Sequence, residues 1–77
     1  MTRIFPEKLQ AARYRLSYDR PYLSTMLYAL VGIETVGIGT MGVDASLRVY
    51  YDPAWVETLP ADQLGGVLYH EIGHVLR

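Results

Sequence analysis

Two histidines and one glutamate near the C-terminal end of the sequence have the spacing of a zinc peptidase site. His70 and His74 are four residues apart, and Glu71 directly follows the first of them. Side chains four residues apart project from the same face of a helix, so both imidazole rings can reach one Zn²⁺ ion. Glu71 lies about 100° round the same helix, where its carboxylate can take a proton from a metal-bound water. We therefore predict that His70 and His74 are zinc ligands and that Glu71 is the catalytic base.

The sequence around this motif predicts an amphipathic helix from Ala61 to Leu76. Pro60 and Asp62 suit its first turn, because that turn leaves amide groups unbonded and favours an acid at its positive end. On a helical wheel the two histidines border an apolar stripe, which suits the wall of a cleft. The competing interpretation is a solvent-facing histidine pair, but both histidines of the 77-residue chain lie in the motif, which favours a metal site. The stripe consists of Leu64, Leu68, Ile72 and Val75.

A catalytic zinc site normally has three protein ligands and an open position for water. Only three residues follow His74, so we expect a third ligand from an acidic residue elsewhere in the chain, from a C-terminal continuation, or from a partner chain. Until that ligand is supplied, we expect the chain alone to cleave peptides poorly. No spacing decides among the acidic candidates, which are Asp19, Glu34, Asp44, Asp52 and Glu57.

Length and composition indicate one folded domain over residues 1–77. Hydrophobic residues make up 51% of the chain and charged residues 19%, which argues against disorder. That apolar fraction is high for so small a domain, so a partner chain or a C-terminal part of a longer protein is expected to cover some of it. The net charge of −1 offers no basic surface for a nucleic acid, and the lack of cysteine excludes disulfides and a thiolate zinc site.

The sequence gives no sign of secretion or of a membrane span. Charges and a proline interrupt the first eight residues, so they do not form the apolar core of a signal peptide. The most hydrophobic stretch, residues 22–43, contains Glu34 and several glycines, and its uncharged portion falls short of the roughly 20 residues that a span requires. We therefore expect a cytoplasmic protein without membrane or nucleic-acid partners.

The remaining elements are predicted from periodicity. Apolar residues at spacings of three and four predict a first helix from Pro6 to about Tyr18 and a second from Tyr22 to about Val31, ended by Gly32. Alternation predicts strands over 36–40 and 47–51, joined as a hairpin across 43–46, followed by a short helical turn over 54–59. The order of these elements predicts a small α+β unit.

The predicted hairpin could also serve the zinc site. A peptidase must hold its substrate extended, and a free strand edge can pair with a peptide backbone. The alternative is that both strands serve only to pack the core, and the sequence does not decide between the two.

The chain resembles the metallopeptidase domain that often precedes a von Willebrand factor A-like domain in bacterial and phage proteins. The resemblance covers nearly the whole chain, and its sharpest parts are Leu47-Arg48-Val49-Tyr50-Tyr51-Asp52-Pro53 and the helix Val67–Val75 with the histidine motif. It implies a zincin-like fold in which His70 and His74 bind zinc and Glu71 is the catalytic base. Members of the family continue past this helix, where a further ligand is expected. This chain differs in stopping at Arg77 and in lacking the usual glycine after Asp44.

Two functions are consistent with these features. The first is a zinc-dependent metallopeptidase that hydrolyses a peptide or protein substrate with a Glu71-activated water. The second is a non-catalytic, metallopeptidase-like structural or binding module in a larger assembly. Glu71 favours the first, because a purely structural zinc site does not need that acid, and the early end of the chain favours the second.

Overall fold

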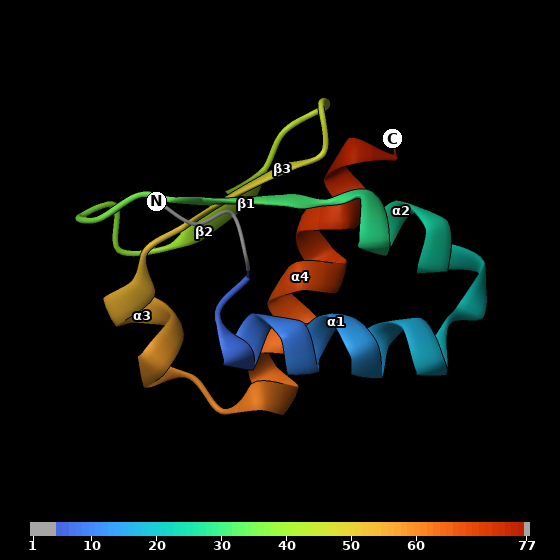
Figure 1. The fold of residues 1–77 in the computed structure, drawn as a ribbon, viewed down its shortest axis with the longest axis horizontal. Helices are drawn as coiled ribbons and strands as arrows, with labels where there is room; N and C mark the ends of the chain where they lie inside the picture. Colours follow the sequence, from blue (N-terminus) through green and yellow to red (C-terminus); the bar gives the residue numbers. More distant parts are fainter. Residues whose placement is uncertain (1–4, 77) are drawn as a thin grey trace.

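The computed structural model describes residues 5–76, which form an α+β fold. The sheet has three strands. Figure 1 shows one long helix beneath this sheet, a second long helix that rises steeply past it, and shorter helices at either end. No helix within the described residues is both long enough and apolar enough to cross a membrane. In chain order the elements are α1 (Glu7–Asp19), η1 (Pro21–Leu23), α2 (Ser24–Ala29), β1 (Val31–Glu34), β2 (Met41–Val43), β3 (Arg48–Tyr51), α3 (Pro53–Thr58) and α4 (Ala61–Val75).

The core is built mainly between α1 and α4, which pack against each other and cross steeply in the view of Figure 1. Each helix contributes one apolar stripe, as the periodicity of the sequence predicts. Val75, expected in the buried stripe of α4, is only half-buried at the end of the helix. The buried side chains are Leu9, Ala12 and Leu16 from α1 and Leu64, Leu68 and Ile72 from α4.

The second predicted helix is shorter than expected at both ends. Pro21 begins a 3₁₀ turn rather than an α-helix, and α2 covers only six residues. Leu30 is already extended, with ψ at 137°, and the next amide, that of Val31, donates to the carbonyl of Leu47 at 3.0 Å. Strand pairing therefore replaces the last helical turn that periodicity predicts.

The sequence analysis missed β1 and wrongly assigned Gly32 as a helix terminator. Gly32 lies inside β1, where the ring of Phe5 packs directly on its backbone. A Cβ atom added at Gly32 would stand 2.8 Å from the Phe5 ring, so only glycine fits this close approach. β1 pairs in parallel with β3, from Val31 opposite Arg48 to Glu34 opposite Tyr51.

The predicted second strand of the hairpin is confirmed as β3, which pairs antiparallel with β2. The predicted first strand, over 36–40, is wrong, because β2 covers Met41–Val43 instead. Residues 35–40 form a loop in which Gly37 and Gly39 have φ values of 95° and 65°. The Asp52 carboxylate accepts hydrogen bonds from the amides of both glycines, at 3.1 and 2.9 Å. It also accepts from the amide of Ala54 at 3.1 Å, which caps α3. The apolar residues of this loop alternate as in a strand. The loop does not form a strand, because the two glycines have positive φ and their amides bind Asp52.

Protonating Asp52 should weaken this loop. Hydrogen bonds from the Gly39, Ala54 and Gly37 amides hold the pKa of Asp52 below its usual value, although burial opposes them. A carboxyl group whose pKa is lower in the folded state stabilises the fold above its unfolded pKa, and this stability is lost as pH falls through the folded pKa. We expect Asp52→Asn to be less stable than the wild type at pH 7, because the asparagine amide group cannot accept all three hydrogen bonds. The difference should shrink below about pH 4.

Urea unfolding of both proteins between pH 7 and pH 2 measures this difference. Asp19→Asn, which changes an exposed aspartate in the same way, is the matched control and should be about as stable as the wild type at pH 7. A stability gap between Asp52→Asn and the wild type that stays constant down to pH 2 would contradict the assigned role of the carboxylate.

Candidate metal centre

The two histidines lie on one uninterrupted helix. α4 continues to Val75, and the amide of Leu76 still donates to the carbonyl of Ile72 at 3.1 Å. Gly73 does not break the helix, although glycine is a poor helix former. The helical placement that the spacing predicts is therefore observed.

The rings of His70 and His74 meet through their Nε2 atoms. These two nitrogens are 2.9 Å apart, the ring centroids are 4.5 Å apart, and the ring planes are perpendicular. Both side chains are exposed. Two histidine nitrogens on one tetrahedral zinc, each at 2.0–2.1 Å from the metal, are roughly 3.3 Å apart, so a small side-chain adjustment is sufficient. The pair therefore fits a zinc ion, provided that both Nε2 atoms present their lone pairs.

Glu71 is half-buried on α4, between the histidines and the buried stripe of the helix. Its position follows from the 3.6-residue period, which places it about 100° from His70. Glu71 therefore projects from the helix between the face that carries the histidines and the buried stripe.

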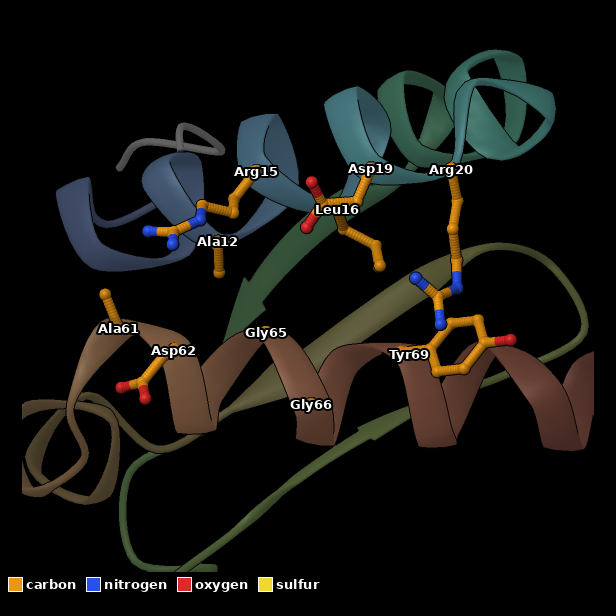
Figure 2. A pocket seen from close by; sticks show the side chains of 10 residues that line it. All are labelled: Ala12, Arg15, Leu16, Asp19, Arg20, Ala61, Asp62, Gly65, Gly66 and Tyr69. Carbon is orange, nitrogen blue, oxygen red and sulfur yellow. The ribbon is translucent and has the colours of Figure 1, made fainter.

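The acidic candidates for a third ligand are not assembled with the histidines. Asp52 holds the 35–40 loop, and the Asp44 carboxylate accepts from the Arg48 guanidinium at 2.8 Å and from the Tyr50 hydroxyl at 3.0 Å. Asp19, at the end of α1, lines a pocket between α1 and α4 (Figure 2). Among residues 5–76, no three histidine or acidic side chains form a group that could hold a metal ion. The described part of the site therefore consists of two nitrogen donors.

A pocket of about 240 Å³ opens beside His70. Leu23 from η1 and Ile72 from α4, both buried, form its floor. Tyr22, Tyr69 and Leu76, all exposed, form its rim. The sequence analysis missed this pocket, because the residues of η1 that line it lie far from His70 in sequence.

Tyr69 separates this pocket from a second one, of about 260 Å³, that runs between α1 and α4. Figure 2 shows the second pocket, with the Arg20 side chain reaching over the Tyr69 ring. The guanidinium carbon lies 4.3 Å from the ring centroid, a cation–π distance. A hydrogen bond with Arg20 lowers the pKa of Tyr69, and a hydrogen bond with Tyr22 has a smaller effect in the same direction. Tyr69 is therefore held by contacts with the segment that follows α1.

Comparison with known protein families identifies a match over nearly the whole chain. A family model described as "Putative metallopeptidase domain" matches residues 4–77, nearly the whole chain. Neither the curated proteins nor the solved structures give a significant match.

Proposed function

Since this chain belongs to the family of metallopeptidase domains, we propose that it is the zinc-binding part of a peptidase that hydrolyses peptide bonds with an activated water. His70 and His74 are the zinc ligands, and Glu71 is the general base. The observation that carries this proposal is the 2.9 Å approach of the two Nε2 atoms on the exposed side of α4. Neutral imidazole nitrogen is a common ligand for zinc, and family membership supports a metal cofactor.

In the proposed reaction the zinc ion and Glu71 have different roles. A bound zinc ion would supply Lewis acidity to the attacking water and to the scissile carbonyl. Glu71 would accept the proton of the attacking water and return it to the departing amine. Because Glu71 is beside the histidines and is not itself a ligand, the carboxylate stays free to move that proton.

The edge of β2 supports binding of an extended peptide near the histidines. β2 is an outer strand of the sheet, in the order β1-β3-β2, and it packs against α4. A peptide that pairs with this edge would run beside the helix that carries the motif. Packing of the core by β2 is compatible with this role, since Met41 is buried while Gly42 and Val43 are only partly covered.

A third zinc ligand is proposed to come from outside the described residues. The exposure of His70 and His74 leaves room for a carboxylate or a histidine from a C-terminal continuation or a partner chain. In this proposal residues 1–77 act as one unit of the peptidase.

The second candidate function is a non-catalytic module in an assembly. Its support is the exposure of large aromatic side chains on α1 and η1, with Tyr14 at 64%, Tyr18 at 76% and Tyr22 at 75%. Tyrosine is enriched in protein–protein interfaces. Such a surface is also compatible with a peptidase that binds a partner.

Zinc binding tests the proposed function. We expect one zinc ion per chain and a loss of about 100-fold or more in affinity for His74→Ala, because even second-shell partners are worth 10–100-fold. Competition with a chromophoric chelator measures the affinity, and metal analysis by mass spectrometry gives the stoichiometry.

Gln63→Ala is the control, since Gln63 is an exposed side chain near the start of the same helix. It should bind zinc as tightly as the wild type. An affinity that is unchanged in His74→Ala would refute the assigned ligands.

A further inference from the structure

The surface between α1 and α4 carries charged side chains of both signs. Arg15 and Asp19 lie one turn apart on α1, and both are exposed. They line the α1 side of the pocket of about 260 Å³, and Asp62 lines its α4 side (Figure 2). Among residues 5–76 the structure gives none of these three side chains an ion-pair partner. Their charges are therefore available to a molecule that docks on this surface.

Exposed tyrosines surround the same surface. Tyr18 follows Arg15 by three residues, so the two side chains are neighbours on α1. Tyr22 hydrogen-bonds with Tyr69, which lines the pocket from α4. Tyr18 and Tyr22 are 76% and 75% exposed. Tyrosine and arginine are enriched in protein interfaces and among the residues that contribute most to binding, so this composition fits a protein partner.

The floor of the pocket leaves room for a side chain of that partner. Gly65 and Gly66 lie in the interior of α4, and a Cβ atom added to either would meet nothing within 4 Å. Packing within the chain therefore does not require glycine at these positions, although glycine weakens a helix interior relative to alanine. Space for an incoming aromatic ring explains both. The other small residues of the floor are Ala12 and Ala61.

The charges on α1 are complementary to a second copy of the same surface. In a two-fold symmetric pair the contacts are reciprocal, so a residue that faces a second position is faced by that position in return. Two antiparallel copies of α1 whose two-fold axis passes at Ser17 would place Arg15 opposite the partner's Asp19, and Asp19 opposite the partner's Arg15. The net charge of −1 opposes such a pairing very little.

From these observations we propose that this surface is a homodimer interface, in which α1 packs antiparallel against α1 of a second copy. Arg15 pairs with the partner's Asp19 on both sides of the axis. The same register puts Tyr18 opposite the partner's Leu16, so the ring packs at the partner's pocket, which Leu16 lines. This inference does not rest on the proposed zinc chemistry. It specifies the partner chain that the high apolar fraction of the sequence predicts.

Sedimentation equilibrium of the full chain, from low micromolar to several hundred micromolar protein, measures the dimer dissociation constant. A metal chelator is present throughout, because zinc shared by the exposed histidines of two chains could otherwise link them. We expect the wild type to form a dimer that dissociates on dilution.

Charge reversal tests the pairing. Arg15→Asp and Asp19→Arg should each weaken the dimer by about 100-fold or more, because each places like charges opposite one another twice. In a mixture of the two variants, one chain has acids at both positions and the other has arginines at both, so a mixed dimer should form. The double variant Arg15→Asp/Asp19→Arg should dimerise within about tenfold of the wild type.

Glu57→Arg is the matched control, a charge reversal at an exposed acid on α3, and should leave the dissociation constant unchanged. Circular dichroism of each variant checks that it is folded, as expected for substitutions of exposed side chains. Association in the mixture is itself a check, since unfolded chains would not restore a specific dimer.

A wild type that stays monomeric at the highest concentration would overturn the proposal and leave the surface to a different protein. A wild-type dimer that persists unchanged in Arg15→Asp and Asp19→Arg would overturn it by placing the interface elsewhere. Loss of the dimer in both single variants, without recovery in the mixture or in the double variant, would overturn the antiparallel pairing of Arg15 with the partner's Asp19.

Discussion

Glu71→Gln should abolish peptide hydrolysis while zinc remains bound. Glutamine keeps the size of the side chain but cannot accept the proton of the attacking water, and loss of general base catalysis typically costs 10²–10⁴-fold in rate. Because Glu71 is not assigned as a ligand, zinc affinity should stay within a few-fold of the wild-type value. Hydrolysis of a fluorogenic peptide library, with the third ligand supplied by a C-terminal continuation or a partner chain, measures the rate. Zinc competition on the same protein samples measures the affinity.

Glu57→Gln is the control, since Glu57 is an exposed glutamate on α3. It should change neither rate nor affinity. Cleavage that survives in Glu71→Gln would remove this residue from the mechanism. Brisk zinc-dependent cleavage by the 77-residue chain, lost in Glu71→Gln, would show that two histidines suffice and that no further protein ligand is needed.

Leu68→Ala should destabilise the fold by about 2–5 kcal/mol, the range for truncating a leucine in a core that relaxes only partly. Leu68 is fully buried, with 0% exposure, on the face of α4 that packs against α1. Equilibrium unfolding in urea measures the free energy. For a domain of this size such a loss can approach the whole stability.

Leu76→Ala is the matched control, a leucine at the end of the same helix that is 60% exposed. Its effect on the free energy of unfolding should stay within about 0.5 kcal/mol. Equal unfolding midpoints for Leu68→Ala and Leu76→Ala would show that the buried stripe does not hold the core together.

The elements that sequence reasoning predicts well are those set by local pattern. α1 and α4 follow from apolar spacings of three and four and from Pro6 and Pro60 at their starts. The α+β class follows from the same reading. The spacing of His70 and His74 likewise determines their approach, because a helix fixes the relation of residues four apart.

The elements that it misses depend on residues distant in the chain. β1 forms because β3, 17 residues later in register, pairs with it and because Phe5 packs on Gly32. The loop at 35–40 depends on Asp52, whose carboxylate binds amides 13 and 15 residues earlier. The pocket beside His70 is likewise invisible in the sequence, since Tyr22 and Leu23 reach it from another element. The periodicity of a short sequence segment does not reveal contacts with residues distant in the chain.

The packing of α1 against α4 has a consequence for folding of the chain during translation. Synthesis proceeds from the N-terminus at about 5–20 residues per second, so α1 leaves the exit tunnel well before its partner exists. The residues of α1 that are buried in the fold stay without their packing partners from α4 until α4 emerges. They are Leu9, Ala12 and Leu16. The same late helix carries both histidines. We therefore expect α4 to pack against α1 and the two histidines to come together at nearly the same stage of folding.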